Sequence, residues 1–292
     1  MTAPGSKPVE SLFVVGSGIM GAGIAAVALT KGMQVHLYDV KDTFLEKGVE
    51  AVNNHLRKMA SKGKFPAADL EKFTSALKPT LTLDDAANTD LVLEAAPERM
   101  EVKKDLLKRL DEIVPPHALL ASNTSSLSIT VMASVVRDPG RVVGIHFFNP
   151  VPSMDLVELI SGAHTRPEVL EAARQFSVKM GKTVTGSKDY PGFVTTRSIG
   201  VLINEAIWML YEGVASREDI DTAHKLGFHH PMGPLELADL VGLDTALSIL
   251  ERLYTGFRDP KYRACPLLVQ MVEAGKLGRK SGEGFYSYPA KG

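Results

Sequence analysis

The sequence predicts an α/β fold, with a doubly wound, mostly parallel sheet followed by a second, smaller all-α domain. Short apolar runs alternate with helical stretches as far as about Lys188, which is the pattern of parallel strands joined by crossover helices. Beyond Lys188 only helical periodicity continues. We therefore expect one domain over residues 1–188, which includes a helical hairpin insertion, and an all-helical domain over residues 189–292.

Strands are expected at short β-branched and apolar runs, and helices where apolar residues recur at a helical period. In the first domain, strands are expected at 12–15, 33–38, 90–94, 118–121, 142–147 and 156–160, helices at 19–31 and 99–113, and two helix-rich segments between 42 and 78. In the second, helices are expected at 191–212, 216–226, 235–253 and 266–274.

Composition narrows the classes of function. Of 292 residues, 45% are hydrophobic and 23% charged, as in an ordinary globular protein. The net charge of −1 predicts neither a nucleic-acid nor a membrane partner, and no apolar run is long enough to span a bilayer. The single cysteine, Cys265, excludes an intrachain disulfide and fits a reducing compartment. Residues 1–10 lack the apolar core of a signal peptide, so we expect a disordered lead-in and a cytoplasmic protein.

A glycine-rich turn, Gly16-Ser17-Gly18-Ile19-Met20-Gly21, follows the first expected strand and opens the first expected helix. Gly16 permits a tight turn, Gly18 lets the backbone approach a pyrophosphate, and Gly21 lets the helix pack closely on the sheet. The helix start at Ile19 and Met20 presents unpaired N–H groups to phosphates. The glycines alone would also suit a purely structural turn, but the complete strand–turn–helix–strand context favours a Rossmann-type dinucleotide site.

Asp39 ends the second expected strand, about 20 residues after the turn, where dinucleotide sites carry an acidic residue. Its carboxylate should accept hydrogen bonds from the ribose hydroxyls and repel a 2′-phosphate, so NAD is favoured over NADP. Lys41 leaves that preference open, because its side chain has the reach to contact a phosphate. The structural alternative for Asp39 is a cap on the next helix.

His146 ends an apolar strand, and in open α/β sheets ligands bind beyond the carboxyl ends of the strands. Glu158 interrupts the apolar run of the following strand, and a buried carboxylate there needs a partner. We predict that Glu158 orients His146, which moves a proton while hydride passes to a nicotinamide. Each residue taken alone also fits a structural role, as a strand-end histidine or as a carboxylate paired with Lys or Arg.

A run of short polar side chains, Ser122-Asn123-Thr124-Ser125-Ser126, follows the strand that ends at Ala121. It is either a turn that caps the next helix or a set of hydroxyls and an amide that hold the substrate oxygen and the nicotinamide. The residues themselves leave both interpretations open.

At these residues the chain resembles the short-chain L-3-hydroxyacyl-CoA dehydrogenase family, in particular the bacterial 3-hydroxybutyryl-CoA dehydrogenases. The resemblance runs from Leu12 to Tyr288, and several blocks in one order make a coincidental match very rare. The most specific blocks are residues 122–126, 146–152, 156–158, 231–234, 242–244 and 278–286.

The resemblance implies roles for individual residues. His146 and Glu158 match the family's catalytic pair, Ser125 matches the serine beside the substrate 3-oxygen and the nicotinamide, and Asn149 matches an asparagine that lines the active site. The helical C-terminal domain of the family forms a homodimer and closes the substrate cleft. Residues around the cofactor are matched by Glu98, Lys103 and Asn123.

Two features bear on the substrate. The family usually carries an asparagine near the substrate carbonyl where this chain has Thr196, a shorter side chain, and the effect of that change is left open. The basic cluster Arg57, Lys58, Lys62 and Lys64 is either a solvated helix face or a surface that attracts the CoA phosphates, with Lys58 and Lys62 as the test positions.

The resemblance and the residues together predict an NAD-dependent 3-hydroxyacyl-CoA dehydrogenase that needs no metal. Two alternatives stay open. One is a sugar-acid (L-gulonate-type) dehydrogenase on the same scaffold, although the block His146-Phe147-Phe148-Asn149-Pro150 favours a CoA substrate. The other is a non-catalytic nucleotide-binding structural protein. The presence of both His146 and Glu158 argues against it, and Thr196 is the one feature that favours it.

Overall fold

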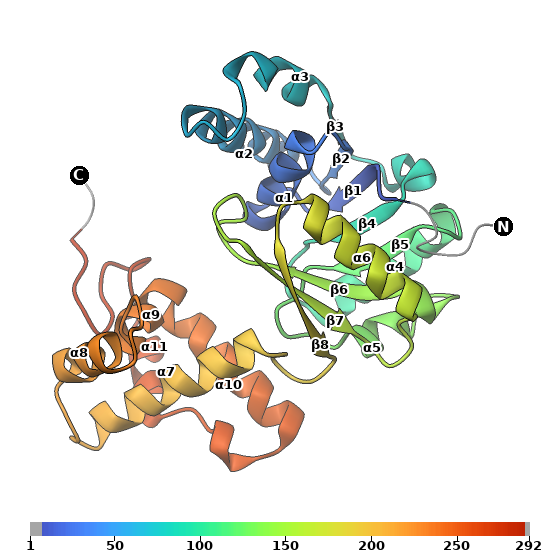
Figure 1. Ribbon diagram of the computed structural model, residues 1–292. Coiled ribbons are helices and arrows are strands. Elements are labelled where there is room, and N and C mark those ends of the chain that lie inside the picture. Colours follow the sequence, from blue (N-terminus) through green and yellow to red (C-terminus); the bar gives the residue numbers. More distant parts are fainter. Residues whose placement is uncertain (1–7, 290–292) are drawn as a thin grey trace. The chain divides into compact units, whose positions relative to one another are not determined.

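The computed structural model describes residues 8–289 (Figure 1). The expected lead-in over residues 1–10 therefore lies mostly outside the described residues. The chain divides into two compact units between Tyr190 and Pro191. No helix of the described chain is long and apolar enough to cross a membrane.

The first unit is built on one sheet of strand order β3-β2-β1-β4-β5-β6-β7-β8. Its strands are β1 (Ser11–Val15), β2 (Gln34–Tyr38), β3 (Leu77–Thr80), β4 (Leu91–Glu94), β5 (Leu119–Ser122), β6 (Val142–Phe147), β7 (Leu156–Ser161) and β8 (Thr183–Lys188). Its helices are α1 (Ile19–Thr30), α2 (Asp42–Ser61), α3 (Leu70–Ser75), α4 (Met100–Ile113), α5 (Ile129–Ala133) and α6 (Pro167–Lys179). Only the β6–β7 pair is antiparallel.

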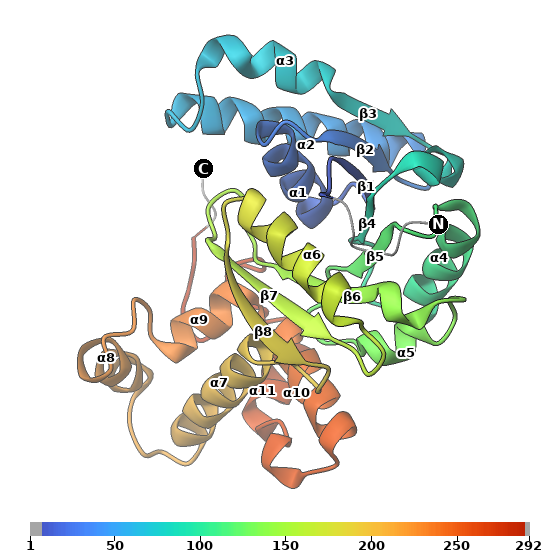
Figure 2. The ribbon, with the colours of Figure 1, turned by 45° about the vertical axis from the view of Figure 1, so that its right-hand side comes forward.

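Helices cover both faces of this sheet (Figures 1 and 2). One face shares a continuous apolar core with α1 and α6, and α2 packs on α1. Helices α4 and α5 cover the opposite face. The strand order reverses between β1 and β4, so the carboxyl ends of these two strands border the crevice in which doubly wound folds bind ligands. The predicted fold class is confirmed.

The antiparallel β6–β7 pair places the two predicted catalytic residues opposite each other. Its register pairs His146 with Glu158 and Phe147 with Val157. Directly opposed residues in a sheet project from the same face, so the two side chains meet on the face away from α1 and α6. The contact agrees with the expectation from the sequence, which did not include the antiparallel strand direction that produces it.

Two strands of the sheet were missing from the predicted elements, as were α5 and α6. β8 has the sequence Thr-Val-Thr-Gly-Ser-Lys and is largely solvent-exposed at the sheet edge, so it carries almost no apolar signal. β3 lies at the other edge and contains Pro79, a residue that weakens any strand prediction and is tolerated at edges.

The second unit is helical up to Glu273, and the described residues that follow contain two isolated β-bridges, Gly278–Glu283 and Glu283–Ser287. The prediction of one continuous helix over 235–253 is wrong, because Gly242 adopts φ 99° and separates two helices there. The helix expected from residue 191 begins later, after Gly192 and Phe193 with positive φ. The helices are α7 (Thr195–Tyr211), α8 (Arg217–Gly227), α9 (Pro234–Val241), α10 (Leu243–Phe257) and α11 (Pro266–Glu273), packed around an apolar core of their own.

Candidate active site

A cavity of about 1080 Å³ opens where the glycine turn meets the ends of β1, β2 and β4. Five of the nine predicted cofactor residues line it, namely Gly16, Gly18, Ile19, Met20 and Asp39. The other four, Gly21, Glu98, Lys103 and Asn123, do not line it. Ile19, at the start of α1, is 72% exposed and lines the cavity. The cavity therefore lies at the site that the sequence predicted for a dinucleotide.

The glycines of the turn divide into two kinds by what a side chain there would meet. A Cβ on Gly21 would lie 1.8 Å from the Gly16 carbonyl oxygen, and a Cβ on Gly16, where φ is +100°, would lie 2.8 Å from the Ala95 oxygen. These glycines are required by the protein's own packing. A Cβ on Gly18 would meet nothing within 4 Å, so its absence makes room for something other than protein, as a pyrophosphate requires.

Asp39 is fixed by three hydrogen bonds at the edge of the cavity. Its Oδ2 accepts from the backbone N–H of Ser17 at 2.8 Å and from the Ser17 hydroxyl at 2.7 Å, and its Oδ1 accepts from Val40 N–H at 2.7 Å. The carboxylate thus joins the end of β2 to the glycine turn. The ammonium of Lys41 lies 5.6 Å from the centre of the Phe44 ring, and Phe44 itself lines the cavity.

His146 and Glu158 form a buried pair. The imidazole Nδ1 lies 3.2 Å from Glu158 Oε2, with Glu158 fully buried and His146 7% exposed. The ring of Phe148 lies 4.4 Å from the His146 ring, centre to centre. The carboxylate is therefore placed to hold one ring nitrogen and to stabilise a positive charge on the imidazole.

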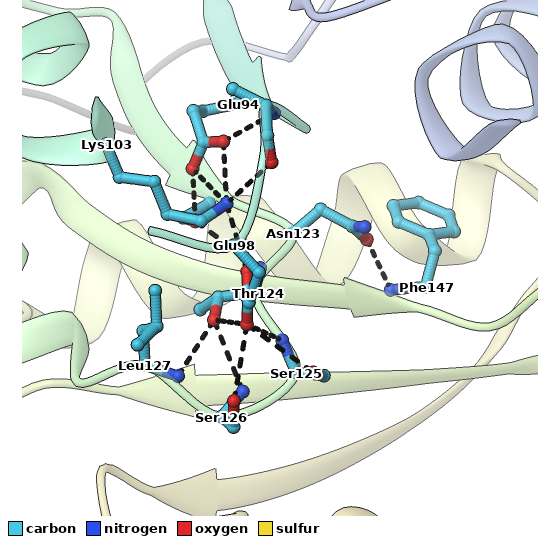
Figure 3. Close-up of polar contacts among 11 residues, drawn as sticks. Glu94, Glu98, Lys103, Asn123, Thr124, Ser125, Ser126, Leu127 and Phe147 are labelled. Atoms are coloured by element: carbon cyan, nitrogen blue, oxygen red, sulfur yellow. Dashed lines mark hydrogen bonds and ion pairs between the residues drawn. The ribbon is translucent and has the colours of Figure 1, made fainter. Parts of the chain in front are cut away.

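Beside this pair, Asn123 joins the ends of two strands. Its side-chain oxygen accepts a hydrogen bond from the backbone N–H of Phe147 at 2.8 Å, which ties the end of β5 to the residue after His146 (Figure 3). Asn149 is solvent-exposed, two residues beyond β6.

A buried charge cluster contacts the polar run 122–126 through Glu98 (Figure 3). Lys103, 1% exposed, contacts both carboxylate oxygens of Glu94 at 2.7 and 3.0 Å and lies 3.2 Å from Glu98 Oε2. Glu98 in turn accepts from the Thr124 hydroxyl at 2.5 Å and from Ser125 N–H at 3.1 Å. Because Lys103 is enclosed by protein atoms, it can affect a ligand only through Glu98 and the polar run.

The two carboxylates of the cluster have opposite pKa shifts. Burial raises the pKa of Glu94 above its ordinary value, although Lys103 and a 2.6 Å hydrogen bond from Ser122 oppose the shift. Burial acts in the same direction on Glu98, but the Lys103 ammonium and the hydrogen bond from Thr124 outweigh it and lower the pKa. Glu98 thus orients the hydroxyl run, and the N-cap of the following helix α5 is Ser128, which lies outside this run.

The predicted substrate residues are less closely assembled. Lys58 is exposed on α2 and Lys62 is exposed at its C-cap, while the apolar side of the helix packs inward. Neither lysine lines the cofactor cavity, whereas His55 of the same helix does. Thr196 is buried in the first turn of α7, in the second unit.

Sequence reasoning missed several residues of the site. Glu94 read only as the end of a strand, and its pairing with Lys103 depends on how α4 returns to the sheet. Other cavity residues carried no motif at all: Val40, Phe44, Lys47, His55, Ala95, Ala96, Pro97 and Arg109. Among the described residues, no group of three or more His, Cys, Asp or Glu side chains is arranged to hold a metal.

A doubly wound sheet, a glycine turn with room for a pyrophosphate and a buried histidine–carboxylate pair at a strand end define an NAD-binding dehydrogenase. Residues 11–190 match the NAD-binding domain of 3-hydroxyacyl-CoA dehydrogenases, and residues 192–288 match the C-terminal domain of the same enzymes. The chain belongs to the 3-hydroxyacyl-CoA dehydrogenase family. The resemblance predicted from the sequence is therefore confirmed, as are the activity class and NAD as the cofactor.

Relatives of this chain match it over nearly its full length. It is 49% identical to a 3-hydroxybutyryl-CoA dehydrogenase of Bradyrhizobium diazoefficiens, over 96% of each chain. It is 44% identical to the 3-hydroxybutyryl-CoA dehydrogenase of Clostridioides difficile, over 95% of this chain and 99% of that one. A crystal structure of (S)-3-hydroxybutyryl-CoA dehydrogenase from Ralstonia eutropha superposes with a TM-score of 0.93 at 45% identity, over 96% of this chain and 99% of that chain.

Proposed function

We propose that His146 is the general acid–base that interconverts L-3-hydroxyacyl-CoA and 3-ketoacyl-CoA, with 3-hydroxybutyryl-CoA among the substrates. The observation that carries the proposal is the 3.2 Å contact between His146 Nδ1 and the fully buried Glu158. With Nδ1 held by the carboxylate, Nε2 is the nitrogen that exchanges a proton with the substrate.

In the oxidative direction, His146 accepts the proton of the 3-hydroxyl group and becomes an imidazolium beside Glu158. The glycine turn and Asp39 would hold NAD, which would supply the acceptor for the C3 hydride, or as NADH its donor in the opposite direction. In the reductive direction the imidazolium gives its proton to the oxygen that was the 3-keto group. Glu158 stabilises the charged ring in both directions, so it acts on the rate through His146.

The polar run supplies the hydrogen bonds around the reacting oxygen. We assign Ser125 to the substrate 3-oxygen and Asn149 to the substrate side of the site, because Ser125 is held by Glu98 and Asn149 is exposed beyond the end of β6. Lys103 and Asn123 then act as positioning residues, the first through Glu98 and the second through Phe147.

Substrate binding and assembly complete the proposal. Thr196 takes the place of the family asparagine, and Lys58 and Lys62 attract the CoA phosphates. Charge reversal at Lys58 and Lys62 should raise the KM for acyl-CoA, and an unchanged KM would discard that part. A homodimer through the helical unit and a cytoplasmic location are also proposed, the first from the resemblance and the second from the lone cysteine.

The test follows NADH absorbance with acetoacetyl-CoA, longer 3-ketoacyl-CoAs and free 3-keto acids. Loss of a general base costs ~10²–10⁴-fold in rate, so His146→Ala should lower kcat by that factor while NADH affinity stays near wild type. Normal turnover by His146→Ala would remove the assignment. Faster turnover of free acids than of thioesters would favour the sugar-acid alternative.

A further inference from the structure

The connection between β6 and β7, residues 148–155, bears on the site because it carries Phe148 and Asn149. It is a compact turn, in which the N–H groups of Ser153 and Met154 both donate to the Pro150 carbonyl, at 2.9 and 3.0 Å. It has no regular strand or helix of its own, so its position depends on what holds it from outside.

One contact is made with the cofactor helix. The side chain of Val151 is 2% exposed and lies over Gly23 of α1, where an added Cβ would come within 3.0 Å of Val151 Cβ. Helix α1 is the helix whose first turn lines the dinucleotide cavity. The connection is thus packed directly against the element that bears the glycine turn.

The other contact is made by Lys182, which immediately precedes β8. Its side chain is buried, at 8% exposure, and its ammonium donates to the carbonyl oxygens of Val151 at 2.6 Å and Met154 at 2.7 Å. The backbone N–H of Lys182 donates to Ser177 at 3.1 Å, so the lysine is itself fixed at the end of α6. Burial lowers the pKa of this lysine, with Lys31 and Lys64 acting in the same direction and Asp155 opposing them.

A buried ammonium is costly, and an apolar side chain of similar length would fill the same space without that desolvation. The ammonium, unlike an apolar group, fixes two peptide groups in the turn that joins Asn149 to the next strand. The neighbouring residue, Thr183, also holds this connection, because its N–H donates to the Asp155 carbonyl at 2.7 Å.

We propose that Lys182 is a positioning residue, which holds the 148–155 connection against α1 and so keeps Phe148 and Asn149 in place beside His146. This rests on the proposed function of His146 and Asn149. It gives the active site a support from the residue before β8, the edge strand, in addition to those from Asn123 after β5 and Glu158 of β7.

The test compares Lys182→Met with Lys179→Met. Lys179 lies three positions earlier and also donates to a backbone carbonyl, that of Val9 at 3.0 Å, but it is exposed and does not contact the connection. Deuterium uptake by peptides spanning residues 147–156 is measured in the free enzyme, and kcat, the KM for acetoacetyl-CoA and the Kd for NADH are measured in parallel.

Lys182→Met should increase uptake in that segment and lower kcat by ~10–100-fold, the range expected when a reacting group is displaced by about 1 Å, with NADH affinity unchanged. Lys179→Met should leave both the deuterium uptake of this segment and kcat at their wild-type values. Equal uptake and equal kcat in the two variants would overturn the proposal. An inactive wild-type enzyme would instead refute the proposed function, and the uptake comparison would still test the contact.

Lys182→Gln covers the case in which the methionine variant does not fold. Glutamine keeps a hydrogen-bond donor but is one bond shorter and uncharged, so it can reach at most one of the two carbonyls. Its kcat should lie between the values of wild type and Lys182→Met. If Lys182→Met is insoluble, the kcat of Lys182→Gln is compared with wild type only and should be lower. A folded Lys182→Gln enzyme with wild-type kcat and uptake would overturn the proposal.

Discussion

Replacing Glu158 by Gln tests the role of the buried carboxylate, because glutamine keeps the size of the side chain and removes its charge. Two unit charges 3.2 Å apart attract by about 5 kcal/mol at an effective dielectric constant near 20. The imidazolium charge is shared between two ring nitrogens and only one faces Glu158, so we expect about half of this, ~2.6 kcal/mol, to be lost. That corresponds to ~100-fold in kcat.

The assay is NAD reduction with L-3-hydroxybutyryl-CoA, the direction in which His146 gains its positive charge, with NADH affinity measured separately by fluorescence. Asp111→Asn is the matched control, because Asp111 is also a buried carboxylate, and its partners are Arg137 and Arg141 at the far end of α4. The control should lose stability and keep kcat. If Glu158→Gln keeps kcat within about threefold of wild type, Glu158 does not stabilise a charged His146 and the mechanism is wrong.

Three further predictions concern the cofactor site and the fold. Gly18→Ala should keep the Tm and weaken NADH binding several-fold, since its Cβ meets no protein atom within 4 Å. Gly21→Ala should instead destabilise the fold by about 1–3 kcal/mol or more, because its Cβ would lie 1.8 Å from the Gly16 oxygen. Calorimetry and NADH fluorescence distinguish the two variants, and a lowered Tm in Gly18→Ala would contradict this account. Asp39→Ser should raise the ratio of NADPH to NADH use by ~10-fold, because it removes a charge that repels the 2′-phosphate; an unchanged ratio of kcat/KM values would show that Asp39 does not select the cofactor. The pKa of Asp111 is lowered, with burial opposing the shift and Arg141 and Arg137 outweighing it, so its contribution to the free energy of unfolding is complete above the ordinary value of 3.8 and is lost as the pH falls below it. Urea unfolding from pH 6 to pH 2 should therefore show a smaller acid-side loss in Asp111→Asn than in wild type, and parallel curves would refute the assignment.

The dinucleotide half of the site could be predicted from the sequence because its chemistry is local. Gly16, Gly18 and Gly21 lie within one turn, and Asp39 follows after one helix and one strand, so chain connectivity alone brings them together. The cavity that Gly16, Gly18 and Asp39 line lies at the end of the first strand, where that reasoning placed it.

The charge cluster could not be predicted in the same way. Glu94 ends β4, Lys103 lies one turn into α4, and Ser122 comes from the next strand, so the contacts depend on how a helix packs back over a sheet. Spacing along the chain does not report such packing. Lys182 illustrates the same limit, since its partners Val151 and Met154 lie about 30 residues earlier in a connection without regular structure.

The pairing of His146 with Glu158 occupies a middle position, because the sequence contained the signal that determines it. Residues 148–155 separate β6 from β7, which is shorter than the dozen or so residues that a parallel crossover requires. The two strands must therefore run antiparallel, and in an antiparallel pair directly opposed residues share one face of the sheet. Once Phe147 is paired with Val157, the carboxylate has no position other than opposite the imidazole. The single antiparallel pairing in this sheet is thus what allows a short connection to bring an acid to the base at the carboxyl end of β6.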